Sequence, residues 1–189
     1  MSGKSKDPAA RGKNAKRRSI KIGETDLAGA WIDWLVDTRT GYLETLLHLP
    51  RKERVKDRGA SFPSIQDIFL HILDNNVWWL ESVPGNHQET HREVKGRPSD
   101  AEIRRQVDRI AKFSRHLAKT LTSAKLDRNY VVRGTSGDGT PFEMNLNLRT
   151  IIWHLVEEEL QHRGELNALL WQLDVDAPTR AWFSSRLAA

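Results

Sequence analysis

Residues 151–166, IIWHLVEEELQHRGEL, decide the fold that we expect for this chain of 189 residues. Apolar side chains recur there at intervals of three and four, which is the period of an α-helix with one buried face. The predicted buried stripe includes two polar side chains at positions where a helical bundle needs apolar ones. Its members are Ile151, Leu155, Glu158, His162, Leu169 and Leu173.

Three earlier segments have the same helical period. The first covers about residues 25–47 and ends before Pro50. The second begins after Ser64, which can cap a helix, and ends before Pro84. The third begins at residues 99–102, SDAE, which have the pattern of a capping box. Four long helices with apolar stripes predict an all-α fold, an antiparallel four-helix bundle.

The chain between the third and fourth helices has a different pattern. Apolar runs at residues 130–132 and 142–144 flank the glycine-rich sequence GTSGDG of residues 134–139, which predicts two short strands around a turn. We therefore expect a short β-hairpin before the last long helix, which runs from about residue 147 to 173. Residues 178–187 predict a short C-terminal helix that packs on the bundle.

Positive charge is concentrated at the N-terminus of the chain, whose net charge is +5. Residues 1–22 carry eight basic residues and one acidic residue, a net of +7, which leaves −2 for residues 23–189. Because residues 1–22 also contain few large apolar side chains, we expect a disordered basic tail followed by one helical domain over residues 23–189. The tail predicts at most a weak, nonspecific contact with nucleic acid.

Composition narrows the class of protein further. The chain has no cysteine, which excludes disulfides, thiolate metal sites and cysteine nucleophiles. No apolar run approaches the roughly 20 residues needed to cross a bilayer. The basic N-terminus lacks the apolar part of a signal peptide. We therefore expect a cytoplasmic protein without a membrane span.

Polar residues on buried faces predict a metal site. Glu158 and His162 lie one helical turn apart, so their side chains can converge on one point. His71, on the inward side of the second helix, can face them across the bundle. Two imidazoles and a carboxylate leave coordination positions open and suit Zn²⁺, Ni²⁺, Fe²⁺ or Mn²⁺. We expect Asn75 and His154 beside the ligands. The alternative to a metal site is a buried ion pair of Glu158 and His162 that binds no metal.

Other positions carry predictions of their own. Arg163 is expected to pair with Glu159 on the surface, one turn earlier. Gly164 predicts a close approach of two helices, because glycine inside a helix costs about 1 kcal/mol relative to alanine. Residues 87–91, HQETH, have the histidine spacing of a zinc protease, but their glutamate is third instead of second, so we expect no zinc site there. The core or the site wall is expected to hold the tryptophans Trp31, Trp78, Trp79, Trp153 and Trp171.

The last-helix motif resembles that of a known family. Residues 154–165, read as His-x3-Glu-x3-His-Arg-Gly-Glu, are similar to the His-x3-His-x3-His-Arg-Gly-Gln signature of the DinB/YfiT-like superfamily. The resemblance covers about residues 25–175 and implies a divalent metal ion bound by His71, Glu158 and His162. A glutamate at the position of Glu158 is found in the related mycothiol-dependent maleylpyruvate isomerase, and it favours harder ions.

The resemblance leaves two classes of function open. The first is a metal-dependent enzyme, of the S-transferase or isomerase type, whose ion activates a low-molecular-weight thiol for reaction with a small-molecule substrate; a homodimer is compatible with it. The second is a non-catalytic metal-binding or stress-response protein with a structural ion. An open site with three protein ligands favours the enzyme, because structural sites usually have four.

Overall fold

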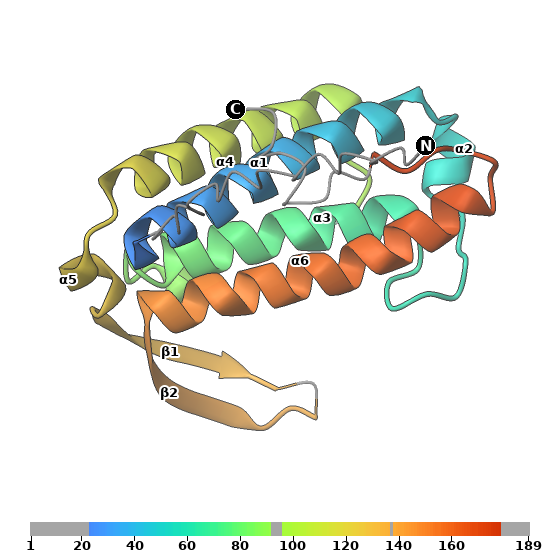
Figure 1. Ribbon diagram of the computed structural model, residues 1–189. Helices are drawn as coiled ribbons and strands as arrows, with labels where there is room; N and C mark the ends of the chain where they lie inside the picture. Colours follow the sequence, from blue (N-terminus) through green and yellow to red (C-terminus); the bar gives the residue numbers. More distant parts are fainter. Residues whose placement is uncertain (1–22, 92–95, 137, 179–189) are drawn as a thin grey trace, which may run out of the picture.

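The computed structural model describes residues 23–91, 96–136 and 138–178. The predicted basic tail and nearly all of the predicted C-terminal helix lie outside these residues. Four long helices run side by side and form the bundle that the apolar stripes predict (Figure 1). They are α1 (Glu24–His48), α3 (Ile65–Val77), α4 (Asp100–Thr120) and α6 (Leu148–Trp171).

The predicted hairpin is also present. Strand β1 (Asn129–Thr135) pairs in antiparallel register with β2 (Pro141–Asn147), and Asn147 then caps α6 by accepting a hydrogen bond from the backbone N–H of Thr150 at 2.9 Å. The all-α fold with a hairpin before the last long helix is therefore confirmed.

Two side chains cap α3 and α4 as predicted. The hydroxyl of Ser64 accepts a hydrogen bond from the backbone N–H of Asp67 at 3.2 Å, at the start of α3. Ser99 and Glu102 form a complete capping box at the start of α4. Such caps form hydrogen bonds with backbone N–H groups that the helix itself leaves unpaired. Each cap contributes about 1 kcal/mol to stability.

Short elements that the periodicity did not predict lie between the long ones. After Val77 the backbone of α3 continues as a π-helical turn, η1 (Trp78–Ser82), closed by a 2.9 Å hydrogen bond from the N–H of Val83 to the carbonyl of Trp78. The others are α2 (Arg51–Arg54), η2 (Gln88–Thr90) and α5 (Ser123–Leu126). Hydropathy has no signal for elements this short, because their ends are fixed by tertiary contacts.

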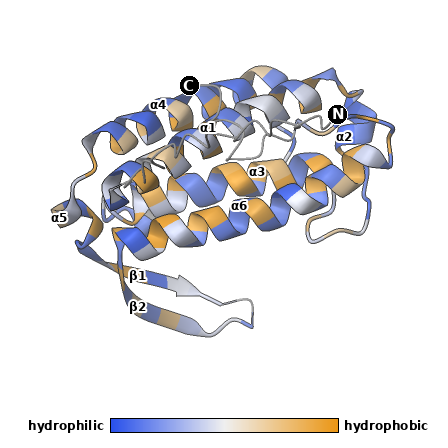
Figure 2. Ribbon diagram, in the orientation of Figure 1, coloured by the Kyte–Doolittle hydropathy of each residue, from blue (hydrophilic) through white to orange (hydrophobic). Residues whose placement is uncertain are grey.

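The core lies between two pairs of helices. Helix α1 packs mainly against α4, and α3 packs mainly against α6, while α6 also contacts α1. Apolar and polar residues alternate along α3 and α6 (Figure 2). Helix α6 thus has two neighbours, α3 and α1, and buries side chains toward each. Within the described ranges, none of the helices combines the length and apolar character of a membrane span.

The predicted close approach of helices at Gly164 is wrong. Gly164 is exposed, and a Cβ built there has no neighbour within 4 Å. The close approach lies instead at Gly29 of α1, where a Cβ would come within 3.2 Å of the carbonyl oxygen of Ala118 in α4.

We therefore expect Gly164→Ala to raise the free energy of unfolding by about 0.5–1 kcal/mol, because alanine restricts the unfolded chain and favours the helix without a clash. Thermal unfolding measures this as a rise of about 1–4 °C in Tm. Gly29→Ala is the matched control and should give no gain, because its Cβ would press on α4. A loss of stability in Gly164→Ala would show that another surface covers this face of α6.

Candidate metal centre

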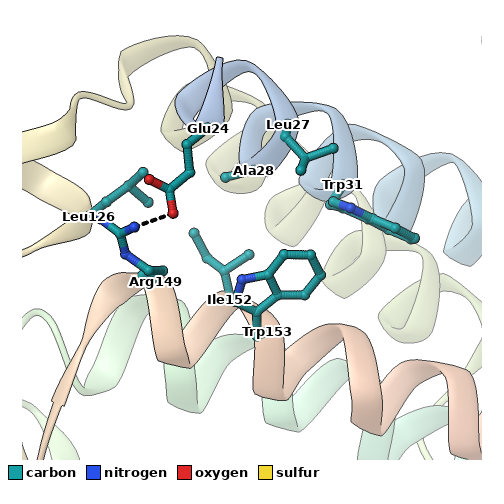
Figure 3. A pocket seen from close by; sticks show the side chains of 8 residues that line it. All are labelled: Glu24, Leu27, Ala28, Trp31, Leu126, Arg149, Ile152 and Trp153. Atoms are coloured by element: carbon teal, nitrogen blue, oxygen red, sulfur yellow. Dashed lines mark hydrogen bonds and ion pairs between the residues drawn. The ribbon is translucent and has the colours of Figure 1, made fainter. Parts of the chain in front are cut away.

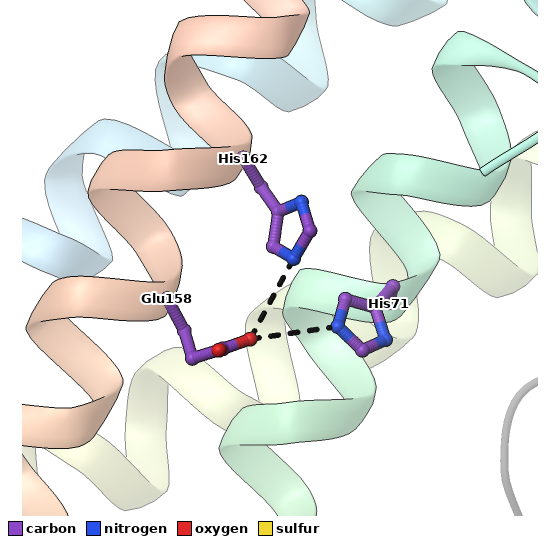
Figure 4. Close-up of side chains that lie close together, drawn as sticks. All are labelled: His71, Glu158 and His162. Atoms are coloured by element: carbon purple, nitrogen blue, oxygen red, sulfur yellow. Dashed lines mark ion pairs between the residues drawn. The ribbon is translucent and has the colours of Figure 1, made fainter. Parts of the chain in front are cut away.

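Three side chains from two helices converge between α3 and α6. His71 comes from α3, and Glu158 and His162 come from α6 (Figure 4). The Nε2 atoms of His71 and His162 lie 3.7 and 3.6 Å from Oε2 of Glu158. Among the described residues, these form the one group of three His, Asp or Glu residues whose ligand atoms all lie within 4.8 Å of one another. The predicted ligands are thus brought together.

The spacing and chemistry of these atoms fit a divalent ion. Bonds of about 2.1 Å hold neighbouring ligand atoms about 3.0–3.6 Å apart for bond angles of 90–120°. The two distances to Glu158 are close to this range, so small side-chain movements would close the group on an ion. The side chains of His71 and Glu158 are 24% and 27% exposed, whereas that of His162 is 5% exposed. The site is therefore reachable from solvent on one side.

A carboxylate orients His162. Nδ1 of His162 lies 3.1 Å from Oε2 of Glu165, which also accepts a hydrogen bond from the hydroxyl of Ser61. When Nδ1–H donates to Glu165, Nε2 is left with a free lone pair directed at Glu158. A carboxylate behind a histidine is the usual support of a metal ligand, because it fixes both the tautomer and the ring orientation.

The neutral form of His71 is favoured as well. Burial lowers the pKa of His71 below its ordinary value, the nearby His162 lowers it further, and Glu158 opposes both. Nε2 of His71 lies 3.0 Å from the amide nitrogen of Asn75, a donor, so this ring nitrogen carries the lone pair. In these tautomers both imidazoles direct the lone pair of Nε2 at the same point.

Phe62 forms a wall of the site. Its ring stacks on that of His71 with centroids 4.2 Å apart and meets the ring of His162 edge-on at 5.6 Å. The hydrogen bond from Ser61 to Glu165 holds the same segment against α6. Sequence reasoning missed all three supporting residues. The sequence could have identified Glu165, because it lies one helical turn after His162. Ser61 and Phe62 lie in a loop, where no periodicity could have identified them.

His154 takes a different place from the three ligands. Its ring packs edge-on against Trp79 with centroids 4.8 Å apart, and it does not belong to the group of converging ligand atoms. Asn75, in contrast, touches that group directly, because its amide nitrogen lies 3.0 Å from Oε2 of Glu158 as well as from His71.

The fully buried carboxylate of α6 is Glu159 and not Glu158. The side chain of Glu159 is 1% exposed and lies 3.3 Å from Nε of Arg39, itself 3% exposed. Arg163 is also buried, with its guanidinium over the ring of Trp34 at 4.5 Å. The predicted surface location of Arg163 and Glu159 is therefore wrong, because this face of α6 packs against α1, although the charge of Arg163 does act on Glu159 and lowers its pKa.

The buried charges of Glu159 and Arg39 have few polar partners to offset the cost of their burial. Burial raises the pKa of Glu159 and lowers the pKa of Arg39, while the attraction between the two groups opposes both shifts. Neither carboxylate oxygen of Glu159 has a hydrogen-bond partner among the described residues, and neither has Nη2 of Arg39. The Nε–H of Arg39 donates instead to the carbonyl of Leu35 at 3.0 Å. This pair joins α1 to α6 directly behind the ligand-bearing face.

The second histidine pair of the sequence, His87 and His91, lies outside the group of converging ligand atoms. His91 lies against α3, with Nε2 at 3.1 Å from the carboxylate of Asp74 and Nδ1 at 3.1 Å from the hydroxyl of Ser82. His87 is exposed, and residues 88–90 form the turn η2. Residues 88–90 thus form a short 3₁₀ turn instead of the α-helix on which a zinc-protease motif places its two histidines.

Two of the tryptophans contradict the expectation of core or site wall. Trp153 and Trp171 are 48% and 60% exposed on the outer face of α6. Trp153 lines a shallow, mainly apolar pocket between α1 and α6 together with Trp31, and an ion pair of Glu24 and Arg149 closes one side of it (Figure 3). Among the described residues that line the pocket, Glu24 is the one carboxylate or imidazole, and we assign no function to the pocket.

Comparison with known proteins confirms the resemblance to the DinB superfamily. The model of the DinB family matches residues 25–180. A search among curated proteins finds no match. The match covers the four long helices, the hairpin and the three converging side chains, and the chain belongs to the DinB family.

Proposed function

We propose that this member of the DinB family binds one divalent metal ion through His71, Glu158 and His162 and is a metal-dependent enzyme that acts with a low-molecular-weight thiol. The convergence of two imidazole nitrogens and one carboxylate oxygen within 4.8 Å of one another carries the proposal of a metal site. Partial exposure of His71 and Glu158 supports access of a small molecule to the ion.

The residues around the ligands have separate tasks in this proposal. Glu165 holds His162 in the tautomer that binds through Nε2. Phe62 keeps water from one side of the site by stacking on His71. A bound divalent ion would lower the pKa of a coordinated thiol, so that thiolate is available at neutral pH. The chain has no cysteine, so the thiol would be a separate molecule.

Metal analysis of the purified protein tests the site. We expect about one divalent ion per chain in the wild type, and loss of the ion in His71→Ala and in His162→Ala, because each change removes one of the two imidazole ligands. His154→Ala is the matched control. It removes a histidine of α6 that lies against Trp79 outside the cluster, so it should retain the ion.

Equal metal content in the wild type and both ligand variants would overturn the proposed site. Thiol conjugation is then tested with the metal-loaded wild type and with His162→Ala, using small electrophiles and a panel of low-molecular-weight thiols. Metal-dependent turnover supports the enzyme.

A second candidate is a non-catalytic protein with a structural ion. Its support is the origin of the ligands on two different helices, because an ion bound there would tie α3 to α6. Full metal occupancy without turnover of any thiol in the panel would favour it over the enzyme.

A further inference from the structure

We propose that Asn75 is a fourth ligand of the ion, through its side-chain carbonyl oxygen. This inference rests on the proposed metal site at His71, Glu158 and His162. It adds a ligand type, a neutral amide oxygen, that the three converging side chains do not supply.

Asn75 already lies among the ligand atoms. It follows His71 by one turn of α3, and the terminal nitrogen of its amide is 3.0 Å from Nε2 of His71 and 3.0 Å from Oε2 of Glu158. Both of these atoms are acceptors, so the two N–H groups of the amide bridge two lone pairs. The amide thus supplies in part the positive charge that an ion would supply.

The position of this terminal atom is that of a ligand. Two ligands of one ion at about 2.1 Å and a bond angle near 90° lie about 3.0 Å apart. The amide nitrogen is at this distance from two of the three ligands. Nitrogen and oxygen of an asparagine exchange places by a half-turn of the amide, with little change of shape.

Metal binding favours that half-turn. Once the single lone pair of His71 Nε2 is directed at an ion, the N–H group of Asn75 that faced it loses its acceptor and would point at a cation, whereas Oε2 of Glu158 keeps a second lone pair. A half-turn replaces this repulsion with a bond from the carbonyl oxygen. Helices α3 and α6 then each supply ligands one turn apart, His71 with Asn75 and Glu158 with His162.

The resulting donor set has two imidazole nitrogens and two oxygens. Oxygen ligands favour harder ions and coordination numbers above four. A fourth protein ligand in such a geometry still leaves positions for a small molecule. The inference therefore predicts that the ion is more than four-coordinate when bound to the wild type.

Cobalt titration of the full-length protein tests this. Co²⁺ is added to the metal-free wild type, Asn75→Ala, Asn75→Asp and the control Gln161→Ala, which removes an exposed amide of α6. We expect weak visible absorption from higher-coordinate Co²⁺ in the wild type. Asn75→Ala should bind at least tenfold more weakly and give stronger, four-coordinate bands, Asn75→Asp should restore the wild-type spectrum, and Gln161→Ala should match the wild type.

Two results would overturn the role of Asn75 as a ligand and leave the proposed metal site standing. One is an unchanged affinity in Asn75→Ala. The other is a weaker affinity with an unchanged spectrum, which would make Asn75 only a hydrogen-bond donor to Glu158. A wild type that binds no Co²⁺ or other divalent ion would overturn the proposed function itself.

Should Asn75→Ala not fold, a crystal structure of the Mn²⁺-loaded wild type decides. An Asn75 oxygen at about 2.1–2.4 Å from the ion supports the inference. An amide farther than about 3 Å from it overturns the inference.

Discussion

We expect Arg39→Met to lower the free energy of unfolding by about 3–5 kcal/mol, the cost of leaving one charge of a buried pair without its partner. The carboxylate of Glu159 is 1% exposed, and Arg39 is the larger of the two nearby charges that offset its burial, the other being Arg163. Chemical denaturation at pH 7 measures the loss. Methionine has a similar length, so lost packing contributes little.

Two controls isolate the effect of burial. Arg104 makes an ion pair with Glu44 in which both side chains are 47% exposed, and Arg104→Met should cost far less stability than Arg39→Met, because solvent screens an exposed pair. The double variant Arg39→Met with Glu159→Leu removes both buried charges and should recover most of the lost stability. If the double variant is as unstable as Arg39→Met, shape and not charge explains the loss.

The pH dependence of stability gives independent evidence that the buried charge of Glu159 causes the loss in Arg39→Met. Burial raises the pKa of Glu159, and Arg39 opposes this shift in the wild type. Without Arg39, the pKa of Glu159 in the folded state lies further above its value in the unfolded state. The stability that protonated Glu159 allows is therefore fully present below the unfolded-state pKa and is lost as the pH rises through the folded-state pKa. The deficit of Arg39→Met should therefore be larger at pH 8 than at pH 5, by up to about 1.4 kcal/mol per pH unit within that window. The double variant should lack this dependence.

Removal of the ion is expected to lower the melting temperature by about 8–15 °C. A ligand that binds only the folded state at about 1,000 times its Kd stabilises it by about 4 kcal/mol, and each kcal/mol corresponds to about 2–4 °C in a domain of this size. The ion would join α3 to α6, so its loss removes a link between two core helices. Calorimetry before and after chelation, with the metal content verified, measures the shift.

His162→Ala is the control for this measurement, because a protein without the site should melt at the same temperature with and without the chelator. An unchanged melting temperature of the wild type after verified removal of the ion would contradict the prediction. It would show that the bundle does not depend on the metal.

Helical period and cap chemistry determined the fold from the sequence alone. The capping box at Ser99 and the cap at Ser64 set helix starts locally, and the glycine-rich residues 134–139 set the hairpin turn. Because i and i+4 side chains always share a helix face, Glu158 and His162 could be paired without knowing any neighbouring helix. Their binding of an ion stays a prediction.

Only the tertiary structure decided which polar residues are buried. Glu158 and Glu159 are adjacent in sequence and point about 100° apart around α6. One faces α3 and the solvent-accessible ligand cluster, and the other faces α1 and Arg39. A period assigns residues to faces, but burial depends on how many helices pack against each face. Since α6 has two packing neighbours, its buried surface is wider than one stripe, and Glu159 and Arg163 belong to the core.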